Sequence, residues 1–151
     1  MKESVIFALF LLCLSTSGFA QSDEENAIKK TITNLFTGMK DADSTLARSA
    51  FADAAIMQTI VNKEGKVSVR NESVNNFIKF IGTPHQQKYD ERIVFTKILI
   101  DGDLAAVWTD YKFYLGDKFS HCGVNSFQLV KGDKGWQIVY IIDTRRKEGC
   151  K

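Results

Sequence analysis

His121 and Asp110 are the two residues of this chain that point most directly to acid–base chemistry. A histidine titrates near neutral pH, and a carboxylate beside it raises its pKa and fixes its tautomer. His121 could act as a general base oriented by Asp110, while Asn125 or Tyr114 polarises a carbonyl group. The alternative is that His121 is a structural histidine, and that Asp110 and Asn125 are hydrogen-bonded groups at strand ends.

Other kinds of chemistry lack the residues they need. The chain has two histidines, His85 and His121, and no His/Cys cluster with metal-ligand spacing. It has no glycine-rich phosphate loop and no readable Ser-His-Asp set. We therefore expect neither a metal nor a cofactor. The formal net charge is +2 and no Lys/Arg cluster alternates with aromatic residues, so nucleic acid is not an expected partner.

The candidate residues fall in one stretch, 101–146, which reads as three successive antiparallel strands. The stretch is rich in Val, Ile, Phe, Tyr and Trp, and turn signals stand at 116–117 and 132–135. This pattern predicts a β-meander that must position any site.

Alternation along the meander sorts its side chains into two faces. We pair Leu115 with Lys118 and Lys131 with Trp136 across the two turns. The first face is then Trp108, Asp110, Lys112, Tyr114, His121, Asn125, Phe127, Trp136, Ile138, Tyr140 and Ile142. The second face is Val107, Thr109, Tyr111, Phe113, Val124, Ser126, Val130, Val139 and Ile141.

Helices and one hairpin precede the meander. Ser22 and Glu25 form a capping box, and apolar residues then recur at helical spacing from Ile28 to Met39. The other expected elements are a short helix over 46–51, a hairpin of 55–61 with 66–69, a helix capped by Asn71 and ended by Gly82, and a strand over 89–100.

Residues 1–20 have the regions of a cleavable secretory signal. Lys2 precedes an apolar run, and Gly18 and Ala20 occupy the small-residue positions before the cleavage site. A membrane anchor is the alternative, but the run is shorter than the roughly 20 residues that span a bilayer. We expect a single mature domain, 21–151, that is secreted or periplasmic and has no membrane contact after cleavage.

Removal of the signal would leave two cysteines, Cys122 and Cys150. Two cysteines in an exported chain suggest a disulfide bond. The alternative is a buried Cys122 with a free Cys150 on a frayed tail.

The order helix, helix, hairpin, helix, four strands resembles the nuclear transport factor 2-like superfamily. The resemblance implies an α+β fold in which a strongly curved antiparallel sheet wraps three N-terminal helices into a cone with a pocket. The segments AVWTDYKFYLGDKFSHCG and FQLVKGDKGWQIVYIIDTRR look like its exported lumazine-binding-like branch, related to polyketide cyclases. Ketosteroid isomerase, scytalone dehydratase and limonene epoxide hydrolase share the fold, but their catalytic sets do not transfer residue by residue.

The resemblance also implies which face lines the pocket. Trp136 and Ile138 occupy the element that faces the helices throughout the superfamily, which assigns the first face to the interior. The expected pocket has Trp108, Tyr114, Phe127 and Tyr140 as apolar walls and Asp110, His121 and Asn125 as polar groups. Arg145 either holds an anionic ligand or joins Asp143 and Arg146 in a surface cluster. The second face, with Val107, Tyr111, Phe113, Val139 and Ile141, would pack on a second copy to form a homodimer.

Three functions fit these expectations. The leading hypothesis is an exported protein that binds a small apolar or aromatic molecule without a cofactor. The second is a cofactor-independent isomerase, dehydratase or cyclase that uses His121 as its acid/base group. The third is a dimerisation module without a ligand.

Overall fold

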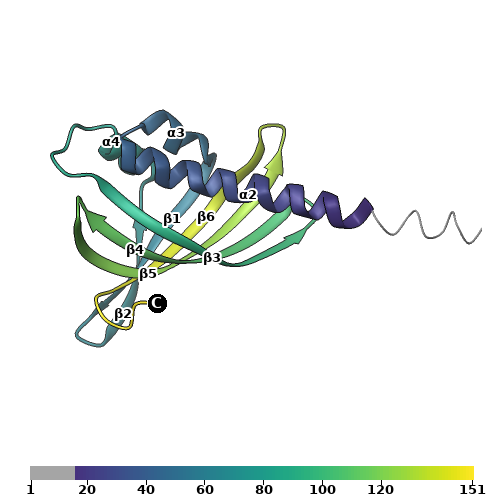
Figure 1. The fold of residues 1–151 in the computed structure, drawn as a ribbon. Helices are drawn as coiled ribbons and strands as arrows, with labels where there is room; N and C mark the ends of the chain where they lie inside the picture. The colour runs from purple at the N-terminus through teal and green to yellow at the C-terminus, as the bar shows by residue number, and fades with distance from the viewer. Residues whose placement is uncertain (1–15) are drawn as a thin grey trace, which may run out of the picture.

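A curved sheet wrapped around one long helix organises the molecule (Figure 1). The computed structural model describes residues 16–151, so most of the expected signal peptide lies outside the described residues. The elements are α2 (Thr16–Asp41), α3 (Ser44–Ser49), β1 (Phe51–Lys63), β2 (Lys66–Glu72), α4 (Val74–Ile81), β3 (Tyr89–Asp101), β4 (Leu104–Leu115), β5 (Lys118–Gly132) and β6 (Gly135–Arg146). This confirms the expected α+β fold and the order of its elements.

The six strands form one sheet in the order β2-β1-β6-β5-β4-β3. All neighbours are antiparallel except β1 and β6, which run parallel. The expectation of a purely antiparallel sheet is therefore wrong at this one pair. β1 and β6 are far apart in the sequence, and α4 with the other strands connects them, so no local turn signal reports their relative direction.

Helix α2 lies along the concave face of the sheet and buries one apolar stripe (Figure 1). Ile28 and Ile32 are fully buried, and Leu35, Phe36 and Met39 are nearly so, as the helical spacing predicted. The helix begins earlier than expected, at Thr16, so Ser22 lies inside it and is not its N-cap. Glu24 links the N-terminal half of α2 to the sheet. Its carboxylate accepts hydrogen bonds of 2.6 Å from both Lys131 Nζ and Trp136 Nε1.

The two short helices begin at side-chain caps. Asp43 Oδ1 accepts a hydrogen bond of 2.9 Å from the Leu46 amide at the start of α3. Ser73 caps α4 in the same way through the Asn76 amide, at 3.3 Å, so the expected cap Asn71 is wrong by two residues. Asn71 instead belongs to β2, which continues to Glu72.

Both predicted turn registers are confirmed, but bulges interrupt the strands beyond them. Leu115 pairs with Lys118, and Lys131 pairs with Trp136. One extra residue then enters β5 between Phe119 and His121, so that His121 lies opposite Phe113 and not Lys112. A second extra residue enters β6 between Ile138 and Tyr140. Each bulge shifts the alternation of side chains by one position.

These shifts exchange parts of the two predicted faces. The concave face buries Ala105, Val107, Thr109, Tyr111, Asn125, Phe127, Leu129, Trp136, Ile138 and Ile141. The predicted outer dimer surface is therefore wrong in the residues it names, because four of them lie on the concave face: Val107, Tyr111, Phe113 and Ile141. The large apolar side chains that stay exposed on the strands include Ile56, Val94, Leu99, Leu104, Trp108 and Val130.

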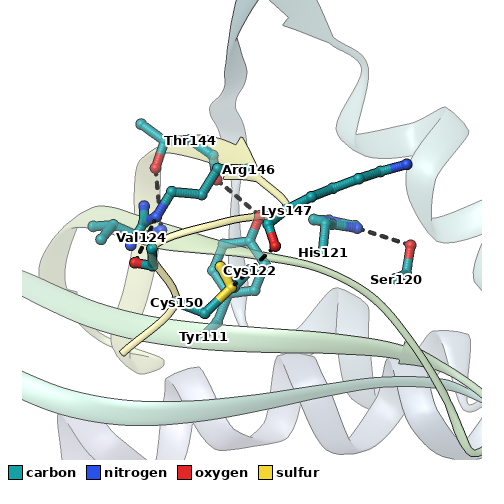
Figure 2. The surroundings of a disulfide bond; sticks show 10 residues. Tyr111, Ser120, His121, Cys122, Val124, Thr144, Arg146, Lys147 and Cys150 are labelled. Atoms are coloured by element: carbon teal, nitrogen blue, oxygen red, sulfur yellow. Dashed lines mark hydrogen bonds between the residues drawn. A yellow bond between two sulfur atoms is a disulfide. The ribbon is translucent and has the colours of Figure 1, made fainter.

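A disulfide bond joins Cys122 in β5 to Cys150 in the C-terminal tail (Figure 2). Cys122 is buried, and the tail folds back so that Arg146 Nε donates a hydrogen bond to the Gly149 carbonyl oxygen at 3.3 Å. The structure therefore confirms the disulfide bond and not the alternative of a free Cys150. In the described range 16–151, no helix is both long and apolar enough to cross a membrane.

Candidate functional site

A cavity of about 500 Å³ opens between the helices and the concave face of the sheet. Its apolar walls come from the helices α2 and α4 and the strands β1, β3, β4 and β6. The apolar lining residues are Leu35, Phe36, Met39, Phe51, Met57, Phe77, Phe80, Ile81, Tyr89, Tyr111, Phe113, Leu115 and Ile141. A cavity of this size with aromatic walls is typical of sites for small molecules.

Stacked rings lie along one side of the cavity. Tyr89 stacks with Phe80 at 5.2 Å between ring centroids and with Phe113 at 6.2 Å. His85 stacks on Tyr89 at 4.2 Å, and its Nδ1 lies 2.7 Å from the Thr83 carbonyl oxygen. Because a carbonyl oxygen only accepts, Nδ1 carries the proton. Phe80 is more than half exposed, so part of this aromatic stack faces solvent.

The polar lining of the cavity includes Glu91 from β3 and Asn125 from β5. Asn125 is 3% exposed, and its Nδ2 donates to Glu91 Oε1 at 2.8 Å and to Thr109 Oγ1 at 3.4 Å. Glu91 keeps some accessible surface because it lines the cavity, yet protein surrounds its carboxyl group. Burial raises the pKa of Glu91 from 4.5 to about 7, with the hydrogen bond from Asn125 acting in the opposite direction. Glu91 therefore exchanges a proton near neutral pH.

A second polar group, formed by Asp143, Arg145 and Tyr111, lies beside Glu91. Arg145 Nε donates to Asp143 Oδ2 at 2.8 Å, and the Tyr111 hydroxyl donates to the Thr144 carbonyl oxygen at 2.8 Å. Burial, followed by the charges of Glu91 and Asp143, raises the pKa of Tyr111, so this phenol stays protonated. Ile141, Asp143 and Arg145 share the concave face because they follow the bulge in β6.

Gly123 makes room for the Tyr111 ring. The two residues pair across β4 and β5. A Cβ atom on Gly123 would lie 2.7 Å from Tyr111 Cε1 and would also collide with the Thr144 carbonyl oxygen. Only a glycine allows this ring to reach across to β6 and hold its hydroxyl beside Asp143.

His121 also lines the cavity, but not with the predicted partner. Its ring lies against Tyr111 and Phe113, and its Nδ1 is 3.1 Å from Ser120 Oγ (Figure 2). Burial lowers the pKa of His121, and the nearby positive charge of Arg145 lowers it further. The predicted His121–Asp110 pair is wrong, because Asp110 pairs with Val94 and Val124 and faces the convex side, whereas His121 faces the cavity.

The structure brings together three of the predicted site residues and separates the others. His121, Asn125 and Arg145 line the cavity. Phe127 faces the same side but is fully buried against Phe36 in the core, at 6.3 Å between ring centroids. The predicted residues on the convex face are Trp108, Asp110, Tyr114 and Tyr140.

Local contacts agree with the convex placement of those residues. Trp108 is 49% exposed, and Tyr114 lies 4.1 Å below the Arg92 guanidinium. Tyr140 pairs with Gln128 on the strand face opposite to Ile138 and Ile141. The two bulges cause this difference from the prediction. Each adds one residue to a strand, so positions beyond it that were predicted to face inward face outward, and the reverse.

Glu91, Tyr111 and Asp143 were not assigned to the pocket from the sequence. A signal for Glu91 is present, because Glu91 shares alternate positions with Tyr89, Ile93 and Phe95, which places a carboxylate on an apolar face of its strand. No comparable signal marks Tyr111, whose inward position depends on the bulge. Within residues 16–151 no cluster of His, Cys, Asp or Glu has the geometry to hold a metal ion.

The fold and the cavity define the class of the protein. A curved sheet that wraps three helices around one pocket is the nuclear transport factor 2-like fold, also called cystatin-like. The chain belongs to the family described as "Putative lumazine-binding", whose model matches residues 23–141.

Solved structures support the fold. One is a nuclear transport factor 2-like protein of unknown function from Shewanella baltica, 21% identical, with a TM-score of 0.66 over 84% of this chain and 97% of that one. Another, from Novosphingobium aromaticivorans, is 9% identical, with a TM-score of 0.68 over 88% of each chain. No curated protein matches the chain in sequence. At these identities the similarity establishes the fold and not an activity.

Proposed function

We propose that the chain is an exported protein that binds a small, partly aromatic molecule in the cavity. The observation that carries this proposal is the cavity of about 500 Å³ itself, with aromatic walls and several polar lining groups. The description of the family also names lumazine, a planar two-ring heterocycle, and a planar ligand of that size suits the stacked rings at Tyr89 and Phe113.

The test is binding of a two-ring aromatic probe, 2-naphthamide, to the purified mature chain, measured by calorimetry. Phe113→Ala removes a ring of the cavity wall and should weaken binding about tenfold, since an aromatic contact of this kind contributes about 1 kcal/mol beyond its buried area. Phe119→Ala is the matched control, because Phe119 packs on Tyr114 away from the cavity. Equal losses in both variants, or no binding to the wild type and no co-purified ligand by native mass spectrometry, would reject the proposal.

Acid–base catalysis is the second candidate, and Glu91 favours it. A carboxyl group with a pKa of about 7 on the wall of an apolar cavity can take a proton from a substrate and return it. In this function Glu91 replaces His121 as the acid/base group of a cofactor-independent isomerase, dehydratase or cyclase.

Proton exchange at a carbonyl probe tests this second candidate. The α-protons of 2-tetralone should exchange with D₂O faster in the presence of the protein, followed by NMR, and Glu91→Gln should abolish the acceleration. His121→Gln should preserve most of it. If only the His121 variant loses the acceleration of exchange, His121 and not Glu91 is the base. If the wild type does not accelerate exchange, acid–base catalysis is rejected as a function.

Export is the remaining part of the proposal. It is supported by the signal pattern of residues 1–20, and the mature chain would begin at Gln21. The expected intact mass of protein recovered from its own host is that of residues 21–151 with one disulfide bond. A mass that retains residues 1–20 would reject cleavage.

A further inference from the structure

Three carboxylates line the cavity in the described part of the chain, and they differ in their partners. Glu72 pairs with Arg70 at 2.7 Å, and Asp143 pairs with Arg145 at 2.8 Å. Glu91 has no ionic partner among the described residues. Its donor is the neutral amide of Asn125, which reaches Oε1, and no described residue donates a hydrogen bond to Oε2.

An ionised carboxylate in such a position is incompletely compensated. Buried charges in proteins are generally paired with an opposite charge, because one neutral hydrogen bond does not replace the lost hydration. A bound molecule that supplies a positive charge or an N–H donor to Oε2 would complete the pairing.

We propose that the cavity selects planar aromatic ligands that carry a cationic, N–H-donating nitrogen, and that this nitrogen pairs with Glu91. The proposal rests on the proposed function, since it requires a ligand in the cavity, and it deepens that function by naming the class of ligand.

The other charged groups around Glu91 do not oppose a cation. Arg145 on β6 is 51% exposed and bonded to Asp143, so this pair is close to neutral. Burial and Arg145 lower the pKa of His121 on β5, which favours its neutral imidazole, and Tyr111 on β4 keeps its proton. The Glu91 carboxylate, which has no ionic partner among the described residues, therefore attracts a cationic ligand and repels an anionic one.

The aromatic walls act in the same direction. Tyr89 and Phe113 stack beside Glu91 on the neighbouring positions of β3 and β4. The faces of aromatic rings attract cations, more strongly where water is excluded. A flat cationic ring system can thus contact the rings and the carboxylate together.

Binding of a cation should also be linked to a proton. The complex favours ionised Glu91, so binding of a permanently cationic ligand releases the proton that Glu91 holds below pH 7. Affinity should be full above about pH 7 and fall by up to tenfold for each pH unit below it.

Three probes of one shape test the proposal: 2-naphthamidine, 2-naphthamide and 2-naphthoate, with charges of +1, 0 and −1. Calorimetry at pH 8 should rank the amidine first, about 10- to 100-fold tighter than the amide, as expected for a charge-assisted hydrogen bond. Naphthoate should bind most weakly. Titrations in two buffers of different ionisation enthalpy at pH 6.5 should show proton release with the amidine and none with the amide.

Variants assign the effect to Glu91. Glu91→Gln keeps an acceptor for Asn125 and should reduce amidine affinity to that of the amide, while leaving the amide within about twofold. Asp101→Asn, an exposed change at the far end of β3, should leave the affinities of all three probes unaltered.

The outcomes separate this inference from the proposed function. Binding of the amide and the amidine with equal affinity would overturn the inference and leave the binding function intact. Tighter binding of naphthoate would overturn it in favour of Arg145 as the recognition group. Absence of binding by all three probes would count against both.

Discussion

Replacing Glu91 by Gln should stabilise the protein in a way that depends on pH. Glu91 has a pKa of about 7 in the folded chain against an ordinary value of 4.5. Between these values the folded state holds a proton that the unfolded state releases, so stability falls as pH rises through this range. Each pH unit contributes about 1.4 kcal/mol, which gives a total of about 3 kcal/mol above pH 7. Gln cannot ionise and should not carry this cost.

Urea unfolding of the oxidised protein at several pH values measures the effect. The free energy of unfolding of Glu91→Gln minus that of the wild type should be near zero at pH 4 and about 3 kcal/mol at pH 8. The subtraction cancels groups such as Asp90 and Glu24, whose pKa values are lowered and which act in the opposite direction. Asp101→Asn should show a difference within about 0.5 kcal/mol at each pH.

Two results would refute the reasoning. A difference that does not change between pH 4 and pH 8 would mean that Glu91 titrates normally and is not shielded by the cavity wall. A variant less stable than the wild type at pH 8 would mean that the carboxylate is already compensated in the folded protein, which would also weaken the inferred cation site.

Three further changes probe other parts of the structure. Gly123→Ala should destabilise the protein by more than about 2 kcal/mol by displacing Tyr111, whereas Gly132→Ala, which points into open space, should stay within about 0.5 kcal/mol in urea unfolding. Reduction of the Cys122–Cys150 bond, which closes a separation of 28 residues, should cost about 3–4 kcal/mol in a melt with and without reductant; an unchanged melt would refute this. The homodimer stays a prediction, now through the convex face, and Trp108→Asp should convert it to a monomer in light scattering; a monomeric wild type would exclude it.

The sequence predicted the elements well because their signals are local. The stripe from Ile28 to Met39 identified the buried face of α2, and turn residues gave both hairpin registers of the meander. The start of α2 and the cap of α4 were misplaced by a few residues, as is common where several polar residues compete for a cap.

The candidate site was predicted less well, because its faces depend on bulges. An extra residue such as Ser120 or Val139 carries no distinctive composition, yet it reverses the assignment of every side chain beyond it. His121 and Asn125 line the cavity, and Asp110 and Tyr140 do not. Alternation alone could have found Glu91 as a carboxylate on an apolar strand face.

The bulges at Ser120 and Val139 also bear on how residue roles are compared between related chains. The residues on either side of a bulge keep the same faces whether or not the extra residue is present. A homologue can therefore gain or lose that residue and still present the same side chains to its cavity. Insertions and deletions of one residue should therefore be tolerated at these two points. An ungapped alignment carried across them would match an inward position with an outward one. Roles should be transferred separately for the segment on each side of a bulge. For the bulge at Val139, the pair Asn125 and Asp143 anchors one side and the pair Leu129 and Ile138 anchors the other.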